Sequence, residues 1–356
     1  MSQRPFFSFI IPTLNSERTL EKTLASIREQ EFDQEQVEIL IVDGGSTDAT
    51  RDFAERYGCR LLENPMVQQE YAKYIGLTEA RGRAAVFIDS DESFVSRDAL
   101  ARRSRVFSDS PSYKFLMLSG YRKPEGASPI NDYINMFSDP FAYYMTGIGG
   151  EVGLFAESWK KRYRCVEETA DFIGFVVPQG RPLPTVDLCA GNTLDVDFVR
   201  SEFAAELESP MVIPRVFYMV LEKAGKVAIL KDDPIVHYSA DRFRTYLKKL
   251  NWRVKVNIHY QEMPGTGYSN REQYQAGWIK YKKYFFLLYG LTVIVPLLQA
   301  LNKGIKTKRP VALLHPVLCF YVAVDICYQY TLKVRGKRLP LKTYGSEEKT
   351  LDFDSD

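Results

Sequence analysis

The stretch AAVFIDSD (residues 84–91) decides the fold, because it is an apolar run that ends in two carboxylates one residue apart. Such a run is typical of a strand that is buried on both faces, as in a parallel sheet. Open α/β sheets bind ligands beyond the carboxyl ends of their strands, where Asp89 and Asp91 would lie. A carboxylate pair there can bind Mg²⁺ or Mn²⁺, the usual partners of a nucleotide diphosphate. A solvated turn has the same composition, so the neighbouring segments must decide.

The region upstream alternates strand and helix patterns. The expected elements are strands over Phe6–Ile11, Val37–Val42 and Arg60–Leu62, a helix that carries Leu20, Leu24 and Ile27, and a helix over Gln68–Ala80. This β-α-β-α-β-α-β order predicts an α/β fold with a parallel sheet and right-handed crossovers. Three polar strand ends, including Asp89–Asp91, are therefore expected at one edge of the sheet.

Four short segments make the pattern more specific. They are IIPTLNSE (residues 10–17), IVDGGSTD (41–48), AKYIG (72–76) and FIDSD (87–91). In order and spacing they resemble glycosyltransferase family 2, densely over residues 6–92 and more thinly to about residue 260. The resemblance implies a GT-A fold (a Rossmann-like, mostly parallel sheet), a nucleotide-sugar donor and a metal-dependent inverting transfer.

The resemblance also implies roles for single residues. Pro12 and Thr13 would line the base and ribose, and Asp43 would bind the nucleobase. Lys73 stands where the family usually has Arg near the diphosphate, and it offers a point charge without bidentate geometry. The segment Leu188–Leu194 is similar to the one that closes over the donor sugar. The donor-binding residues implied are Pro12, Thr13, Asn15, Glu17, Asp43, Lys73, Asp89, Ser90, Gly191 and Asn192.

The same resemblance implies a Mg²⁺ or Mn²⁺ site. Asp91 would bind the metal directly, and Asp89 would contact the ribose or a metal-bound water. His237 corresponds to a C-terminal histidine that often completes the site. A lone histidine is as often a core or surface residue, so this assignment is an expectation from position in the sequence.

The catalytic base of the family is missing from its usual place. A Glu-Asp pair is expected at the start of a helix predicted over Val212–Ala224, but that place holds Ile213-Pro214. The nearest acids are Glu206, Glu208, Asp195, Asp197, Glu167 and Glu168. Glu208 is the candidate base if the acceptor is a hydroxyl. A phosphate acceptor would need no base, and a catalytically silent binding protein would need none either.

Composition limits the partners. The 47 Lys and Arg residues nearly balance the 45 Asp and Glu residues, so no overall field attracts nucleic acid. The five cysteines are odd in number and lack a C-x-x-C spacing, which favours a reduced, cytosolic-facing compartment. No signal peptide is expected, because Ser2–Pro5 before the first strand is too short for one.

The middle of the chain is less informative. A helix is predicted over Asp98–Phe107, and strands over Phe115–Tyr121 and Val227–Leu230. The segment Asn131–Gly150 is rich in aromatic residues, which would either face the acceptor or pack in a core.

The last third of the chain points to a membrane. The segment Asp241–Glu262 is a basic amphipathic helix that would lie on an anionic membrane or pack on the protein. Tyr284–Leu301 and Val311–Leu332 are apolar enough to enter the bilayer. Lysine and arginine flank both segments and also fill Asn302–Pro310 between them, against the positive-inside rule for a two-span hairpin. A re-entrant or interfacial hairpin and two true spans both stay open.

The sequence thus predicts a GT-A catalytic domain over residues 1–240, a basic connector over 241–283, a membrane hairpin over 284–332 and a polar, disordered tail over 333–356. The expected function is transfer of a sugar to a lipid-linked acceptor, either a saccharide hydroxyl or a polyprenyl phosphate, at the cytoplasmic face of the inner membrane. The alternatives are a silent nucleotide-sugar-binding scaffold and a sugar nucleotidyltransferase.

Overall fold

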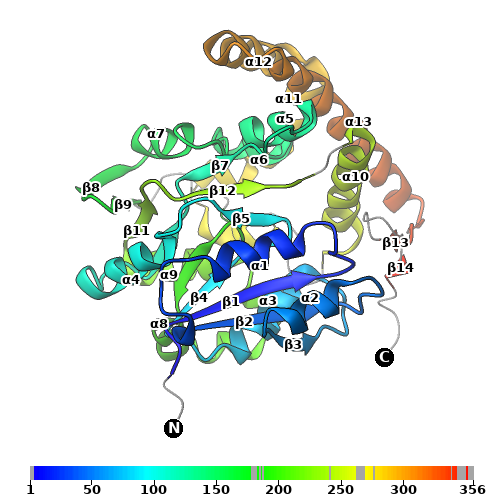
Figure 1. Cartoon of the computed structure of the whole chain (residues 1–356). Helices are drawn as coiled ribbons and strands as arrows, with labels where there is room; N and C mark the ends of the chain where they lie inside the picture. The colour runs from blue at the N-terminus through cyan, green and yellow to red at the C-terminus, as the bar shows by residue number, and fades with distance from the viewer. Residues whose placement is uncertain are drawn as a thin grey trace. The chain divides into compact units, whose positions relative to one another are not determined.

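The computed structural model describes residues 4–177, 183, 186, 188–239, 242–261, 269–275, 277–337, 339–342 and 350–351 (Figure 1). The chain forms two compact units. Unit 1 comprises Met1–Arg122, Val152–Pro178 and Val186–Tyr238, and unit 2 comprises Lys123–Glu151, Gln179–Thr185 and Ser239–Asp356. The division differs from the single boundary expected near residue 240, because the segment 123–151 packs with the C-terminal third of the chain.

The main sheet of unit 1 has the strand order β3-β2-β1-β4-β10-β6-β11-β9-β8. Its strands are β1 (Phe7–Thr13), β2 (Val37–Asp43), β3 (Arg60–Glu63), β4 (Ala84–Phe87), β6 (Phe115–Met117), β8 (Arg164–Glu168), β9 (Phe172–Val176), β10 (Asn192–Asp195) and β11 (Val227–Leu230). The first four pair in parallel, and β10 runs antiparallel to β4. The alternation predicted over residues 6–92 is confirmed, and the mixed α/β sheet agrees with a GT-A architecture.

Helices cover this sheet and connect its strands. They are α1 (Leu20–Arg28), α2 (Thr50–Arg56), α3 (Gln69–Glu79), α4 (Ala99–Asp109), α7 (Leu154–Lys160), α8 (Val196–Glu202) and α9 (Val216–Ala224), with 3-10 turns η1 (Gln34–Gln36), η2 (Glu206–Glu208) and η3 (Pro210–Val212). Helix α3 lies directly on β1. A Cβ atom on Gly76 would come within 2.3 Å of Ile10, so only glycine allows this close approach.

Two predicted elements differ from the structure. The strand expected over Phe115–Tyr121 is split, because β6 joins the main sheet while β7 (Gly120–Arg122) joins a small second sheet with β5 (Glu92–Phe94) and β12 (Pro234–His237). The chain turns between the sheets at Gly120, whose φ of 136° favours glycine. The helix expected from Val212 begins at Val216, because Pro210–Val212 forms a 3-10 turn instead. It ends as predicted, with Gly225 in the left-handed conformation.

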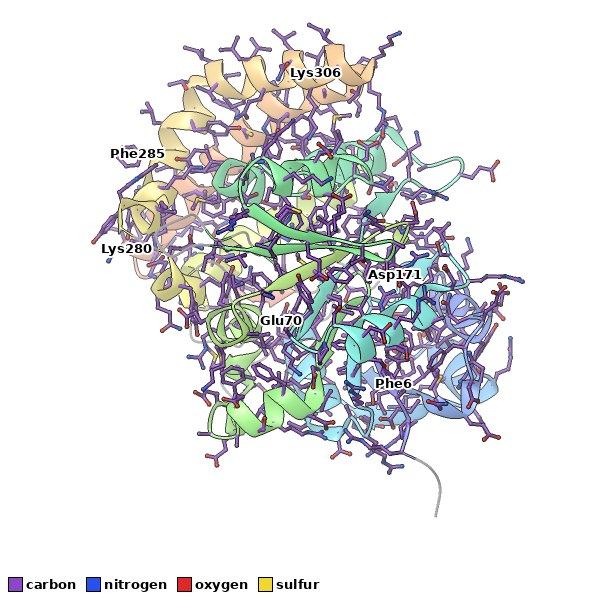
Figure 2. The ribbon with its side chains drawn as sticks, turned by 90° about the vertical axis from the view of Figure 1, so that its left-hand side faces the viewer. Phe6, Glu70, Asp171, Lys280, Phe285 and Lys306 are labelled. Carbon is purple, nitrogen blue, oxygen red and sulfur yellow. The ribbon has the colours of Figure 1, made fainter. Side chains whose placement is uncertain are left out.

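Unit 2 is helical. It contains α5 (Pro129–Phe137), α6 (Pro140–Thr146), α10 (Phe243–His259), α11 (Phe286–Thr292), α12 (Ile294–Thr307) and α13 (Leu314–Val334), with turns η4 (Ser269–Tyr274), η5 (Gly277–Phe285) and η6 (Pro310–Leu313). Figure 2 labels Lys280 and Phe285 on η5 and Lys306 on α12. Short strands β13 (Leu341–Lys342) and β14 (Thr350–Leu351) pair with each other. Of the tail expected over 333–356, the first two residues belong to α13, and residues 338, 343–349 and 352–356 lie outside the described residues.

The core of unit 2 answers two questions that the sequence left open. Tyr133 and Phe137 of α5 are fully buried in it, and Phe137 stacks on His315 with ring centroids 4.2 Å apart. These aromatic residues are therefore core residues. The apolar face of α10, including Tyr246 and Leu250, is buried against the same core. That face is used inside unit 2 and does not lie open for a membrane surface.

Candidate active site

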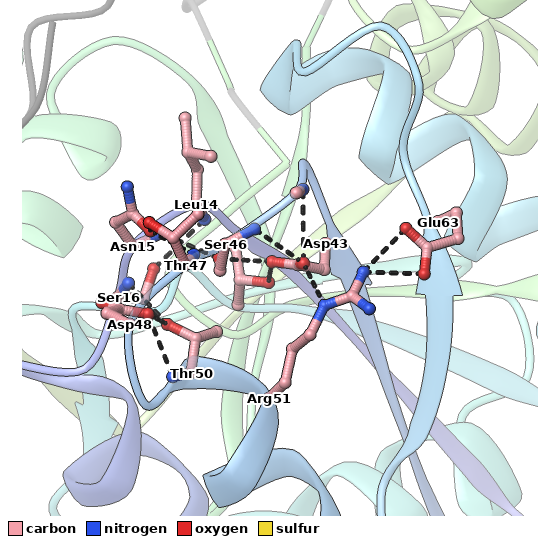
Figure 3. A network of polar contacts seen from close by, with 12 residues as sticks. Leu14, Asn15, Ser16, Asp43, Ser46, Thr47, Asp48, Thr50, Arg51 and Glu63 are labelled. Carbon is pink, nitrogen blue, oxygen red and sulfur yellow. Dashed lines mark hydrogen bonds and ion pairs between the residues drawn. The ribbon is translucent and has the colours of Figure 1, made fainter. Parts of the chain in front are cut away.

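The loops after β1 and β2 are joined by hydrogen bonds between side chains and backbone (Figure 3). The Asn15 amide nitrogen donates to Ser46 Oγ at 2.8 Å, and Asn15 Oδ1 accepts from the Thr47 amide at 2.9 Å. The Glu17 carboxylate accepts from the Ala49 amide at 3.2 Å. Asn15 and Glu17, which the sequence predicts to bind the nucleotide sugar, therefore hold the loops after β1 and β2 together. The two loops lie side by side because β1 and β2 are parallel neighbours in the sheet.

Asp43 is the centre of this network. It is fully buried, and its carboxylate accepts hydrogen bonds from Thr13 Oγ1, the Gly45 amide, Ser46 and Arg51 Nε. Burial alone would raise the pKa of Asp43, but the hydrogen bonds from Ser46, Arg51 and Thr13 outweigh burial and lower it. The carboxylate is thus held ionised and orders the loop after β2. Contact between Asp43 and a nucleobase stays a prediction.

The turn that carries Asp89 and Asp91 follows β4. Lys73 of α3 is buried, and its Nζ lies 3.7 Å from Asp89 Oδ1. Nε2 of His237, the last residue of β12, lies 3.5 Å from Asp91 Oδ2. The hydroxyls of Ser90 and Ser16 lie 2.9 Å apart, which connects the turn to the loop after β1. The structure therefore brings together residues that the sequence places up to 164 positions apart (residues 73 and 237).

Glu92 is a site residue that sequence reasoning missed. Its Oε2 accepts hydrogen bonds from the amides of Asp89 (2.8 Å) and Ala190 (2.6 Å), and its Oε1 accepts from Tyr121 OH at 3.1 Å. Burial raises the pKa of Glu92 to about 8, and the neighbouring Asp89 carboxylate adds to the shift. The only signal in the sequence was that Glu92 directly follows Asp89 and Asp91. Three acids so close together are also typical of a solvated turn.

The segment with Gly191 and Asn192 lies beside the end of β4. Asn192 pairs with Phe87, and the Gly191 amide donates to the Phe87 carbonyl at 2.8 Å. Gly191 has a φ of 71°, and an added Cβ atom would come within 3.0 Å of Arg103 Nη2. Both predicted residues therefore lie next to the Asp89 turn, where a side chain at position 191 would be crowded and its backbone strained.

A buried ion pair supports that segment. Arg103 and Asp233 are both fully buried, with guanidinium–carboxylate distances of 2.7 and 2.9 Å. Arg103 also donates to the Gly191 carbonyl at 3.0 Å and to Thr193 Oγ1 at 3.0 Å. Breaking these contacts would leave a buried charge without compensation, so the pair helps to hold Gly191 in place. No sequence pattern predicts this pair, because its members lie 130 positions apart.

The residues present fit a divalent cation. Asp89 Oδ1 is buried and accepts no hydrogen bond from the described part of the chain. Carboxylate oxygens suit Mg²⁺ and Mn²⁺. Among the described residues, the group of three ligands whose atoms all lie within 4.8 Å of one another is Asp89, Glu92 and Cys189. The predicted metal ligands are therefore not all in this group: Asp89 belongs to it, whereas Asp91 lies beside His237.

The acids proposed as base differ in their surroundings. Asp195 caps α8 and pairs with Lys114 at 2.8 Å, so it is a structural residue. Similar partners engage three others: Asp197 pairs with Arg4, Glu168 with Lys231, and Glu167 accepts from Tyr113 OH. Glu206 and Glu208 are exposed on η2. The carbonyl of Leu207 accepts a hydrogen bond from Tyr74 OH at 2.9 Å, which ties this turn to α3, the helix of Lys73.

Comparisons with known proteins match the first third of the chain. The family model for glycosyl transferase family 2 matches residues 8–104. The chain is 32% identical over 100 residues to the poly(ribitol-phosphate) beta-N-acetylglucosaminyltransferase TarS of Staphylococcus aureus, covering 26% of this chain and 17% of that protein. It is 36% identical over 104 residues to a PGL/p-HBAD biosynthesis glycosyltransferase of Mycobacterium bovis, covering 28% of this chain and 40% of that protein.

The matched stretch spans less than half the length of either relative. Among solved structures, S. aureus TarS 1-349 in complex with UDP aligns over 98% of this chain and 99% of that one, at 14% identity and a TM-score of 0.47. The matched residues 8–104 include every strand end described above from β1 to β4. Residues 8–104, which carry the four segments and place their ends at one edge of the sheet, therefore form a glycosyl transferase family 2 domain.

Proposed function

We propose that this protein is an inverting glycosyltransferase that uses a nucleotide-sugar donor and a divalent cation, Mg²⁺ or Mn²⁺. The observation that carries the proposal is the grouping of charges at the end of β4. One buried lysine and two aspartates meet there, with Lys73 Nζ 3.7 Å from Asp89 Oδ1 and His237 3.5 Å from Asp91. Such a group suits a diphosphate, which needs cations around it, and a metal, which needs anionic ligands.

Each residue then has a part in the reaction. Asp91 and His237, with Asp89, would hold the cation, which would neutralise the charge that develops on the leaving nucleoside diphosphate. Lys73 would hold a phosphate oxygen as a point charge. The loops that Asp43 orders would position the nucleoside. The acceptor oxygen attacks the anomeric carbon from the face opposite the diphosphate, and the bond from that carbon to the diphosphate oxygen breaks.

We propose further that the acceptor is lipid-linked and that the protein works at the cytoplasmic face of the inner membrane. Large apolar side chains exposed on α11 and α12 support this placement. If the acceptor is a saccharide hydroxyl, an acid must take its proton, and Glu208 is the candidate. If the acceptor is a polyprenyl phosphate, it is already an anion and needs no base.

A second function is favoured by one observation. Ile213-Pro214 occupies the place of the family's base, and neither residue can accept a proton. A catalytically silent nucleotide-sugar-binding scaffold would tolerate this change.

One experiment separates these functions. The full chain is screened by thermal unfolding against UDP-, GDP- and dTDP-sugars with Mn²⁺, because a ligand stabilises by its affinity and concentration alone. A donor that stabilises the protein is then incubated with it, and release of nucleoside diphosphate is measured. Stabilisation with slow release is expected for a transferase. Stabilisation without release or transfer would favour the scaffold, and no stabilisation by any donor would contradict both.

A further inference from the structure

Helix α12 of unit 2 exposes an apolar stripe along its length. Ile294, Leu298, Leu301 and Ile305 recur at intervals of four, three and four residues, which places them on one helix face. All four are exposed, Leu298 by 61% and Ile305 by 75%. On the other side, Pro296 and Ala300 are buried in unit 2. The helix therefore has one face in the protein and one apolar face without a described partner.

The segment before α12 extends this surface. It exposes the aromatic residues Trp278, Tyr281, Tyr284 and Phe285 on η5 and the leucines Leu288 and Leu291 on α11. Phe285 and Lys280 lie at the same edge of the view in Figure 2. Tryptophan and tyrosine prefer the headgroup level of a bilayer, where one end of the ring is apolar and the other is wet.

The charge of this region matches an anionic surface. Residues 273–324 contain seven lysines or arginines and no aspartate or glutamate. Lys306 and Lys308 are exposed at the C-terminal end of α12, next to Ile305. Cations beside an apolar helix face are attracted to anionic lipid headgroups while the apolar side chains enter the acyl boundary.

The shape of the segment argues against a span. The pair Gly277–Thr292 and Ile294–Thr307 bends by 78° at a break where Val293 has a φ of 62°. Helix α12 has 14 residues and is therefore about 21 Å long, short of the roughly 30 Å hydrocarbon core. Helix α12 is therefore too short to cross a bilayer by itself, and the bend prevents the two halves from crossing as one rod.

Helix α13 is long and apolar enough to cross a membrane, but the neighbouring helix α10 carries too many charges to lie in the hydrocarbon. Helix α10 packs along α13 from Tyr321 onward: Tyr321 OH donates to the Leu247 carbonyl (3.5 Å), and Asn251 Nδ2 donates to both oxygens of Asp325 (2.9 and 3.0 Å). On the same stretch α10 carries Lys248, Lys249, Arg253 and Lys255. If α13 crossed, these cations would lie in the hydrocarbon, where charged side chains are strongly disfavoured.

From these observations we infer that unit 2 is a monotopic membrane-binding unit: the exposed face of α12, with η5 and α11, lies in the plane of an anionic bilayer interface, and α13 does not cross. The inference deepens the membrane placement in the proposed function by naming the surface and its lipid chemistry. It does not depend on the identity of the donor.

Vesicle flotation of the full chain tests the inference. Vesicles of phosphatidylcholine alone are compared with vesicles that also contain phosphatidylglycerol. Recovery is expected with the anionic vesicles and should fall as salt is raised, since exposed charges are screened. The double variant Leu298→Glu/Ile305→Glu should lose at least tenfold in recovery. Its circular dichroism and melting temperature should stay unchanged, because both side chains are exposed in the wild type.

The matched control is Val324→Glu on α13, whose side chain is 44% exposed at the middle of that helix. The inference expects it to float like the wild type, whereas a crossing α13 would not tolerate the charge. Cys327, also exposed on α13, should react with a charged maleimide in vesicle-bound protein, as peptide mapping would show. Loss of flotation in Val324→Glu, or protection of Cys327, would overturn the inference.

Two further outcomes matter. If the wild type forms a dimer without lipid and Leu298→Glu/Ile305→Glu makes it monomeric, a second copy covers this face and the inference is wrong. Donor-induced thermal stabilisation should persist in the double variant. If the wild type floats but no donor stabilises it, the proposed function fails and the membrane inference stands.

Discussion

The Glu92 carboxylate lies 2.6 Å from the backbone nitrogen of Ala190 and accepts its hydrogen, across 98 positions of sequence. The same oxygen accepts the Asp89 amide hydrogen at 2.8 Å. A single buried acid thereby joins the turn that carries Asp89 and Asp91 to the segment that carries Gly191. The two halves of the candidate site are thus fixed relative to each other by one side chain.

Removing this link should affect stability and donor binding together. Glu92→Ala leaves two buried amides without an acceptor, and we expect a loss of about 1–3 kcal/mol in the free energy of unfolding. The KM for the donor should rise more than kcat falls, because Glu92 holds the Asp89 turn and the Ala190 segment in place through backbone hydrogen bonds. Glu92→Gln keeps one acceptor oxygen and should recover part of both. Urea unfolding and donor kinetics measure this, and an Ala variant that matches the wild type in both would contradict the assignment.

Asp91→Asn tests the metal site. We expect turnover to fall by about 10²–10³-fold, the range observed when one electrostatic stabiliser is removed, and metal-dependent donor binding to disappear. The fold should persist, since Asp91 lies in the turn after β4 and its side chain is partly exposed. Asp197→Asn, which removes an exposed pair with Arg4, is the control and should change little. Wild-type turnover in Asp91→Asn would refute the metal role.

Lys73 is expected to bind the donor diphosphate. Lys73→Ala removes a buried cation 3.7 Å from Asp89 and should weaken donor binding by about 10- to 100-fold. Lys73→Arg restores the charge and the residue type usual in the family, and it should recover most of the affinity. Titration calorimetry with the donor and Mn²⁺ measures both. Equal affinities for all three proteins would show that Lys73 is a structural residue.

Glu208→Gln tests the missing base. With a hydroxyl acceptor, turnover should fall by about 10²-fold or more at nearly constant donor affinity, because the proton then lacks an acceptor. With a polyprenyl phosphate acceptor the same change should cost little. Glu168→Gln, at an acid that pairs with Lys231, is the matched comparison. A large loss at Glu168 alone would move the base there, and no loss at either acid with a hydroxyl acceptor would refute both.

Asp43 predicts a pH dependence of stability. Its pKa in the folded protein lies below the ordinary value of 3.8, so the folded state favours the ionised form. The contribution to stability is therefore complete well above pH 3.8 and is lost as the pH falls through the folded-state pKa. The difference in free energy of unfolding between wild type and Asp43→Asn should shrink as the pH is lowered from about 6 to 2. A difference that stays constant over this range would contradict the prediction.

The sequence by itself determined the first half of unit 1. Strands β1, β2 and β4 are mostly apolar segments that can be recognised locally. Right-handed crossovers allow essentially one arrangement of such β-α-β units, so the sequence predicted that Thr13, Asp43 and Asp89 lie at one edge of the sheet. Local pattern also fixed the end of α9 at Gly225, since a left-handed stop is a property of one residue. The family resemblance implied that Lys73 lies near the diphosphate, and the structure adds that its Nζ is 3.7 Å from Asp89 Oδ1.

Tertiary structure alone decided the rest. Glu92 and the Arg103–Asp233 pair belong to the site because distant segments meet there, and a buried acid is indistinguishable in sequence from a solvated one. The amphipathic pattern of α10 left open whether its apolar face meets a membrane or packs on the protein, and the structure buries that face in the core it shares with α13. An amphipathic pattern predicts that one face of a helix is covered. Only the packing of the helices shows whether protein or another partner covers it. The exposed stripe on α12 is the face that packing leaves uncovered.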